Sequence, residues 1–590
     1  MIAILCTLGT NAADEIICKT FDKVLLTHQL TPAGPIPTVV DPNGVYPYMS
    51  YSETSNRPVP QKYRMILLEN NKVKAVICPD LCGKVISLVH KESGKEVLYT
   101  PEIVKYTRIL PRFYFVAGGI EVSFPISHSP TQNEKVLYRI DRTNDRIYVS
   151  CGERELHYGM QWTVEYSLGV NDDHLTQRVI YYNPGKDAYP WMSWSNAALP
   201  CAPDTQYDFP NGKVLSHAST LKEIDWKTEG IKQESDIKEM TGYFWQTTDV
   251  NAFGAYTPSL GTGLYHIATA ESAPGIKLWS YGVEEDKEWS MLSTPRRQPY
   301  VEIQGGPIRD QSIKLELKSG EKRNHVEYWI PTDKPLDIYS LKVPQNKLRN
   351  IDEIPLFGWA RPSEYVFWED LQNAYFKQES LPEVIDPEMN IWAPSGMEQL
   401  DNAFIWATTS STGESKIYWK YYYGTWLAGR ERIGEAINQL EGLDYDLAKA
   451  LLARLYVQKK DFEKARISYS SITEKSWLAL HPQVVVERDK VLRKFGNSTM
   501  EERAKWLSLV DASTDEWIAE RKIQWLIDNN EYKKAKELLL STPFQKVHQT
   551  YTRTGLWEQI CEGLHSKNKA VPFRLGEDRL ARFGAYREYE

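Results

Sequence analysis

The stretch Lys84-Val-Ile-Ser-Leu-Val-His90, followed by Lys91-Glu-Ser-Gly94 and Lys95-Glu-Val-Leu-Tyr99, shows how the first half of the chain folds. Apolar residues alternate with others in the outer segments, which is the pattern of half-buried strands. The middle segment ends in glycine and is typical of a turn. The stretch therefore predicts two strands joined by a tight connection.

The same pattern recurs from about residue 20 to residue 345. Further strands are predicted over 146–150, 161–168, 174–182 and 325–330. So many short strands within one region favour a large β-sandwich made of two sheets. We assign residues 14–345 to this domain.

Residues 426–590 show a helical pattern. The segments Leu455–Ala465 and Trp525–Ala535 match, with Ala465 and Ala535 separated by 70 positions, about two periods of a 34-residue helical hairpin repeat. A small residue lets paired helices approach closely. This resembles a tetratricopeptide array with a C-terminal tail; a plain helical bundle is the alternative. The intervening residues 346–425 contain scattered prolines and many aromatics, which predicts a connector packed on the sandwich.

Composition limits the function. The 590 residues carry a net charge of −8, which argues against a nucleic-acid-binding surface. The sequence has no run of about 20 apolar residues, so we expect no membrane span. Residues 1–13 resemble the remnant of a signal peptide, so we expect a periplasmic or secreted protein. Six of the seven cysteines remain if Cys6 leaves with the signal, and these six are interpreted mainly as buried thiols, with room for one disulfide. We predict no metal or cofactor.

Two glycine-flanked carboxylates suggest chemistry. Gly118-Gly-Ile-Glu121 and Tyr300-Val-Glu-Ile-Gln-Gly-Gly306 each place a glutamate in an apolar strand beside a glycine pair. Carboxylates on rigid strands can bind sugar hydroxyls or transfer protons. The alternative is that these are strand ends with surface acids.

These motifs occur with several others in an order that resembles a known family. The family is an uncharacterised β-sandwich domain, often fused to tetratricopeptide repeats and related in fold to galactose mutarotase and to sandwich domains of glycoside-processing enzymes. The resemblance runs from about Val73 to Pro331 and rests on residues 118–128, 191–198, 207–217, 253–256 with His266, 274–282 and 300–311.

The resemblance implies a concave sheet that holds a sugar. Glu302 resembles the late-strand catalytic glutamate, His217 and His266 are candidate acids, and Glu121 is a candidate second carboxylate. Each histidine has a structural role as its alternative, and each tryptophan a place in the core. The candidate substrate-binding residues are Trp191, Trp194, Asn196, His128, Tyr256, Trp279, Gln304 and Arg297.

We therefore expect an exported carbohydrate-active protein that acts on a glycosidic bond or an anomeric centre by general acid–base catalysis. A glycoside hydrolase-like enzyme is the first choice and an aldose epimerase-like enzyme the second. The alternative is a non-catalytic protein that binds an oligosaccharide or polysaccharide and uses its helices to bind a protein partner. A third interpretation treats the sandwich as a scaffold for the helices.

Overall fold

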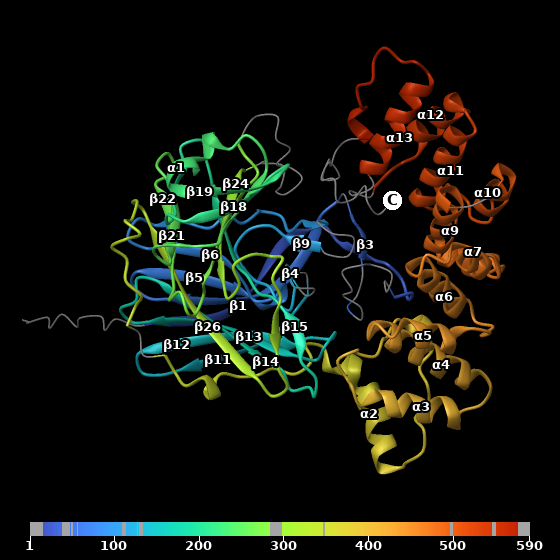
Figure 1. Cartoon of the computed structure of the whole chain (residues 1–590), viewed down its shortest axis with the longest axis horizontal. Coiled ribbons are helices and arrows are strands. Elements are labelled where there is room, and N and C mark those ends of the chain that lie inside the picture. The colour runs from blue at the N-terminus through green and yellow to red at the C-terminus, as the bar shows by residue number, and fades with distance from the viewer. Residues whose placement is uncertain are drawn as a thin grey trace, which may run out of the picture.

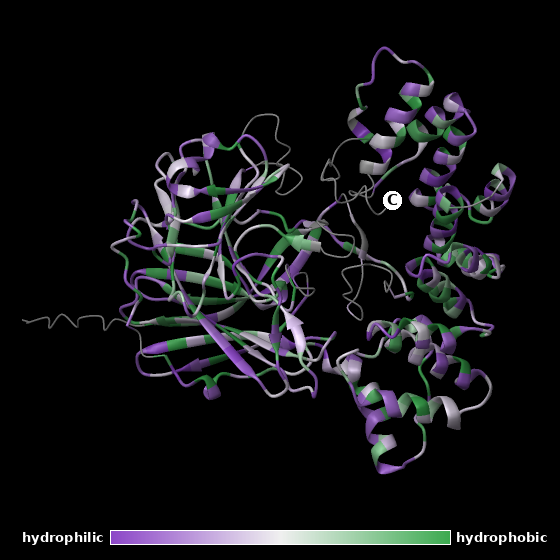
Figure 2. Cartoon of the chain, viewed as in Figure 1, coloured by the Kyte–Doolittle hydropathy of each residue, from purple (hydrophilic) through white to green (hydrophobic). Residues whose placement is uncertain are grey.

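The computed structural model describes residues 16–575, except 38–47, 49–50, 56, 109–113, 127, 129–131, 133, 284–297, 346–347, 496–498 and 546–549. A β-sandwich forms the first part and a column of helices lies beside it (Figure 1). Hydrophobic and hydrophilic residues are interspersed along the strands of the sandwich (Figure 2), and the buried hydrophobic ones form its core. The predicted sandwich followed by helices is confirmed. The predicted signal remnant lies outside the described residues.

Within the described residues the larger sheet has 12 strands and places the candidate site. Its order is β1-β4-β5-β6-β10-β16-β24-β23-β20-β18-β19, with β7 beside β6. The strands paired in this sheet are antiparallel, and the predicted pair of strands at 84–99 is present as β6 and β7. The bounds are β1 (Ile17–Thr27), β4 (Val59–Glu69), β5 (Val73–Cys78), β6 (Lys84–His90), β7 (Lys95–Glu96), β10 (Ile120–Val122), β16 (Ser195–Pro200), β24 (Tyr300–Gly306), β23 (Gly275–Ser280), β20 (Thr241–Trp245), β18 (Lys213–His217) and β19 (Leu221–Asp225).

The smaller sheet packs against one face of the larger sheet and has eight strands in the described part of the chain. Alternating apolar side chains from both sheets form the shared core, in which Trp162 and Trp329 are fully buried. The order, with bounds, is β11 (Leu137–Arg142), β12 (Arg146–Arg154), β13 (Gln161–Gly169), β14 (Leu175–Tyr182), β26 (Lys322–Thr332), β22 (Thr262–Ile267), β21 (Ala252–Thr257) and β17 (Gln206–Asp208).

The helices begin earlier than predicted. Residues 346–425 contain three helices, so this region is the start of the helical part and not a connector. Its aromatics form helix-to-helix contacts, as Trp368 does with Tyr422, at 4.8 Å between ring centroids. The longer helices are α2 (Pro362–Lys377), α3 (Leu400–Ser410), α4 (Gly413–Gly429), α5 (Ile433–Leu440), α6 (Asp446–Gln458), α7 (Phe462–Ser470), α9 (Pro482–Phe495), α10 (Met500–Leu507), α11 (Glu516–Asp528), α12 (Tyr532–Ser541) and α13 (Thr550–Gly563).

The two matched segments are helical hairpins. One joins α6 to α7 and the other joins α11 to α12. Ala465 and Ala535 are both fully buried, as expected of small residues between close helices. None of the described helices is long and apolar enough to cross a membrane. Of the six described cysteines, all except Cys18 are buried.

A short N-terminal segment ties the helices to the sandwich. The indole nitrogen of Trp392 donates to the Pro35 carbonyl at 3.2 Å. The Arg454 guanidinium on α6 donates to the carbonyls of Ile36 at 2.7 Å and Pro37 at 2.8 Å. Because these carbonyls are buried, they need such donors. The helical part therefore already binds an extended segment of its own chain.

We predict that Arg454→Met destabilises the protein strongly. Arg454 is buried and also pairs with Glu487 at 2.6 Å, so its removal leaves the carboxylate without its cationic partner and takes the Arg454 donor from two buried carbonyls. The expected loss in the free energy of unfolding is about 3 kcal/mol, measured by urea denaturation.

The matched control is Arg466→Met, which removes an exposed ion pair with Glu463 on α7. Such pairs contribute about 0–1 kcal/mol. Equal destabilisation by the two variants would contradict a clamping role for Arg454.

Candidate functional site

A row of polar side chains crosses the outer face of the larger sheet. Glu121 on β10 lies opposite Asn196 on β16, which lies opposite Gln304 on β24, which lies opposite Lys277 on β23. Lys84 on β6 continues the row, because Val85 pairs with Ile120. Directly opposed residues point to the same face of a sheet. Residues distant in sequence are thus brought together by register alone.

A second row runs two residues along the same strands. Glu302 lies between Ala198 on β16 and Trp279 on β23. The row continues through Gly242 to His217. His217 is thus three strands from Glu302, roughly 14 Å at the usual strand spacing, and it is exposed. The prediction of His217 as a catalytic acid is corrected, because it lies at the rim and has no contact with the glutamate.

The glycines allow the strands to pack closely. Gly119 has φ +72°, and a Cβ there would lie 2.4 Å from the Val85 carbonyl oxygen. A Cβ on Gly305 would lie 2.4 Å from Glu327 Oε1. Both positions therefore exclude larger side chains. The glycine pairs in the two motifs serve backbone packing beside Glu121 and Glu302.

Charged groups contact one another within the rows. Lys84 Nζ lies 3.7 Å from Glu121 Oε2, and His128 Nδ1 lies 3.2 Å from Glu121 Oε1. The Gln304 amide donates to Glu302 Oε2 at 2.8 Å. Lys84, Glu121, Glu302 and Gln304 are buried. Charged side chains are rarely buried unless paired or functional.

The two glutamates have pKa values shifted in opposite directions. Burial raises the pKa of Glu302, the nearby negative charge of Glu121 adds to this, and His128 with two lysines only partly offsets it. Burial also opposes ionisation of Glu121, but the charge and hydrogen bonds of His128 and Lys84 outweigh it and lower its pKa. Such divergence is the pattern of an acid paired with a base.

The two lysines are also perturbed. Burial lowers the pKa of Lys277 to about 8, although Glu302 and Glu121 favour its charged form. Burial likewise lowers the pKa of Lys84. Both amines can therefore release or take up a proton more easily than surface lysines. The site thus contains several groups that can exchange protons.

Aromatic side chains flank the charged rows. On one side Tyr300 stacks on Tyr99 at 4.6 Å and meets Trp279 at 5.8 Å between ring centroids. On the other side the Lys277 amine lies 4.8 Å from the Phe244 ring centre and 6.0 Å from that of Trp194. These walls exclude water and strengthen the electrostatic interactions between them.

Two polar atoms at the site can accept or donate to a ligand. Among the described residues, Asn196 Oδ1 and Trp194 Nε1 are buried without a hydrogen-bond partner. Buried polar atoms normally have partners. Asn196 Oδ1 can accept a hydrogen bond and Trp194 Nε1 can donate one, which suits the hydroxyl groups of a polar substrate.

Three predicted site residues lie elsewhere. His266 is fully buried in the core between the sheets, where its Nε2 lies 3.0 Å from Glu327 Oε1. Trp191 packs in the same core against Tyr181. The Tyr256 hydroxyl, on the smaller sheet, donates to the Asp333 carbonyl. These assignments are corrected because none of the three residues lies on a strand of the larger sheet: His266 and Tyr256 are on β22 and β21 of the smaller sheet, and Trp191 is on β15 (Tyr189–Trp191), which pairs outside both. Arg297 lies outside the described residues.

Lys84 and Lys277 belong to the site but are absent from the residues that the sequence predicted for it. Lys277 lies between two apolar residues of a strand, in Gly275-Ile-Lys-Leu-Trp279, and Lys84 begins a strand directly before Val85. Alternation puts Lys277 and Trp279 on one face and Ile276 and Leu278 on the other. A lysine on the same strand face as a tryptophan is therefore the sequence pattern that could have identified Lys277 as a site residue. Within the described part of the chain, no group of three His, Cys, Asp or Glu residues is arranged to hold a metal ion.

Comparisons place the chain among known sequences and structures. A family described as a domain of unknown function, DUF5107, matches residues 40–332, and a second model, described as a C-terminal domain, matches residues 368–560. The crystal structure of a TPR-domain containing protein from Parabacteroides distasonis is 73% identical, with a TM-score of 0.87, over 96% of this chain and 99% of that chain.

The sandwich is also similar to more distant structures. A galactose mutarotase-like protein from Clostridium acetobutylicum is 14% identical over 46% of this chain and 95% of that chain, with a TM-score of 0.35. A galactose mutarotase related enzyme from Lactobacillus acidophilus is 14% identical over 45% and 96%, with a TM-score of 0.33. Similarity at this level does not define an activity.

We predict that Lys277→Met stabilises the protein at pH 7. The folded-state pKa of about 8 lies below the ordinary value of 10.5, so below pH 8 the fold must hold a charge that the unfolded chain holds more easily. The gain should be on the order of 1 kcal/mol, shrink between pH 8 and pH 10.5, and vanish above that range.

Thermal unfolding measured across this pH range tests the prediction. The control is Lys213→Met, at an exposed position on β18, which should change stability little. A loss of stability in Lys277→Met at pH 7 would show that the amine stabilises the fold.

Proposed function

The chain belongs to the family of the TPR-domain containing protein from Parabacteroides distasonis, and we propose that its sandwich is a carbohydrate-processing enzyme. The observation that supports this best is the pair of buried glutamates with pKa values shifted in opposite directions on one sheet face. Sugar chemistry at a glycosidic bond or an anomeric carbon needs one group that gives a proton and another that takes one.

Glu302 is the proposed acid. Its raised pKa keeps a proton on the carboxyl group closer to neutral pH. The Gln304 amide, bound at 2.8 Å, orients the carboxyl group. From this position Glu302 delivers its proton to the oxygen that leaves the anomeric carbon.

Glu121 is the proposed base or nucleophile. Its lowered pKa keeps it ionised, and contacts with Lys84 and His128 fix its orientation. The Lys277 amine, between Trp194 and Phe244, can bind a substrate hydroxyl. We favour hydrolysis of a glycosidic bond. Aldose epimerisation is the second candidate, because His128 lies beside Glu121 and a histidine can also transfer a proton.

The surroundings favour a sugar over other small molecules. Asn196 Oδ1 and the Trp194 indole suit hydroxyl groups, and the partly exposed Trp279 offers aromatic surface for the apolar face of a sugar. Export from the cytoplasm is part of the proposal and is supported only by the sequence pattern of residues 1–13. Binding of a protein partner by the helices is likewise a proposal.

We expect Glu302→Gln to abolish turnover without unfolding the protein. The amide is isosteric and can still accept from Gln304, but it cannot deliver the proton. Activity on a panel of neutral and acidic oligosaccharides, read as released reducing sugar and as anomer interconversion, should fall by at least 100-fold.

The control is His217→Gln, on the same row but exposed and about 14 Å away, which should retain full activity. Unchanged turnover in Glu302→Gln at a native melting temperature would refute its role as the acid. Binding without release across the panel would identify a glycan-binding protein.

The pH profile should reflect the two shifted carboxyls. The value of kcat/KM should fall at high pH as Glu302 loses its proton, and this limb should lie above the ordinary glutamate range. It should fall at low pH only where Glu121 becomes protonated, below its ordinary range. In Glu121→Gln the acid limb should disappear along with most of the activity. A profile with both limbs at ordinary glutamate values would contradict the assignment.

A further inference from the structure

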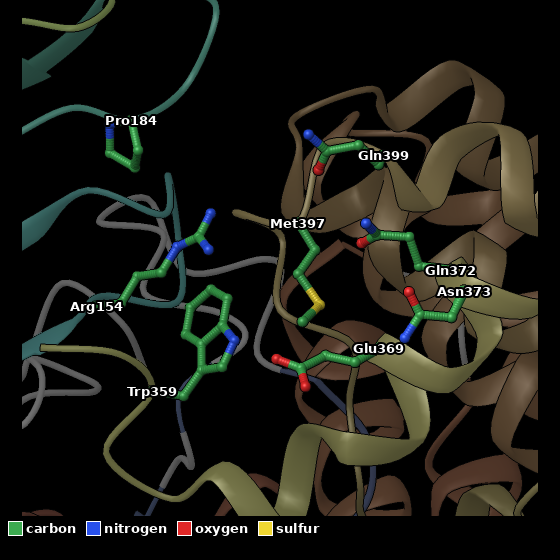
Figure 3. Close-up of a pocket in the computed structure, with 8 residues that line it drawn as sticks. All are labelled: Arg154, Pro184, Trp359, Glu369, Gln372, Asn373, Met397 and Gln399. Atoms are coloured by element: carbon green, nitrogen blue, oxygen red, sulfur yellow. The ribbon is translucent and has the colours of Figure 1, made fainter. Parts of the chain in front are cut away.

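A cavity separates the end of the smaller sheet from the helices. Its volume is about 440 Å³, within the range of small-molecule sites. Arg154, the last residue of β12, and Trp359 line the sandwich side (Figure 3). Gln372 on α2 and Gln399 line the helical side, facing them across the cavity. None of these residues belongs to the rows of the candidate active site.

Arg154 is held in place with part of its guanidinium free. Its Nε donates to the Gly159 carbonyl at 3.0 Å, and its Cζ lies 4.4 Å from the centre of the Trp359 ring. Its backbone nitrogen donates to the Gly358 carbonyl at 2.7 Å, which fixes Trp359 beside it. Among the described residues, no group hydrogen-bonds the two terminal nitrogens of Arg154. Figure 3 shows them pointing into the cavity.

The helical side supplies groups of complementary character. Glu369, Gln372 and Asn373 lie at adjacent positions on one face of α2, while Trp368 and Leu371 on another face are buried. No hydrogen bond is made by the three polar side chains or by Gln399 within the part of the chain that the structure describes. The sandwich side of the cavity therefore offers guanidinium donors. The helical side offers amide donors together with amide and carboxylate acceptors.

A second hollow continues the cavity. Its volume is about 310 Å³, and it shares Arg154, Pro184 and Gln399 with the first. Lys186 and Ser319 add a donor and a hydroxyl. The combined lining is polar. It suits a ligand with several polar groups better than an apolar molecule.

We propose that this cavity binds a saccharide at a site separate from the one on the larger sheet. Hydroxyl groups both donate and accept, so they match a wall that alternates donors with acceptors. A sugar carboxylate would pair with the free guanidinium of Arg154 through charge-assisted bonds. The ligand would contact both the sandwich and α2, and would hold the two parts together. This proposal does not require the larger sheet to be catalytic.

The test uses the full chain with Glu302→Gln, which prevents turnover. Maltotetraose and trigalacturonic acid are the probes, one neutral and one carboxylated. Calorimetry gives the affinity, and amide hydrogen exchange of α2 (Pro362–Lys377) locates the binding. The variants are Arg154→Met, and Gln372→Ala combined with Asn373→Ala, which changes only polar positions on the helix surface. Arg139→Met, at an exposed arginine on β11, is the control.

At least one probe should slow exchange in α2. Its affinity should fall at least tenfold in Arg154→Met, fall severalfold in the α2 double variant, and stay unchanged in the control. Preference for trigalacturonic acid would assign carboxylated sugars to the site, and equal binding would assign hydroxyl recognition.

The inference is overturned if neither probe slows exchange in α2, or if the double variant binds as tightly as its parent. Sugar release by the unmodified chain is measured separately. Protection of α2 without release contradicts only the catalytic proposal, whereas release without protection of α2 contradicts only the cavity.

Discussion

The antiparallel register of β10, β16, β24 and β23 is the constraint on which the candidate site depends. It sets Glu121, Asn196, Gln304 and Lys277 opposite one another on the outer face of the larger sheet. A slip of one residue would turn every one of these side chains into the core. The cluster is costly, because burying charged groups opposes folding even where they are paired. Proteins commonly retain such costs at functional sites.

A buried polar network beneath the rows fixes this register. Glu327 lies 3.0 Å from His266 Nε2 and 2.9 Å from His325 Nε2 in the core. The Ser195 hydroxyl also donates to Glu327, and Gly305 leaves room for its carboxylate. Burial opposes ionisation of Glu327, but the two histidines outweigh it and lower its pKa. His266 thus contributes to the position of β16 and β24 from below, and not as a catalytic group.

Much of the architecture could be predicted because strand alternation and helical hairpins are local patterns. The start of the helical part, predicted at residue 426, could not, because prolines and aromatics look alike in a loop and at helix starts such as Pro362. Glu121 and Glu302 were found through their glycine pairs, which are local too. His217 and His266 were misplaced because the face and distance of a side chain depend on pairing between distant strands. Lys277 was passed over because a lysine in sequence gives no sign of burial.

The helical part is attached to the sandwich through the N-terminal segment of its own chain, and it is not a free interaction module. Arg454 and Trp392 bind the carbonyls of an N-terminal segment, so part of the surface that an array could offer to another protein is already covered. At the cavity, Arg154 faces α2 with two terminal nitrogens that no described residue binds. The carbonyls of the N-terminal segment find their donors within the chain, whereas the cavity is polar and open. A ligand that fills the cavity would therefore contact the same two parts of the chain that the N-terminal segment holds together. Sugar binding in the cavity would thus affect how the sandwich and the helices are held relative to each other.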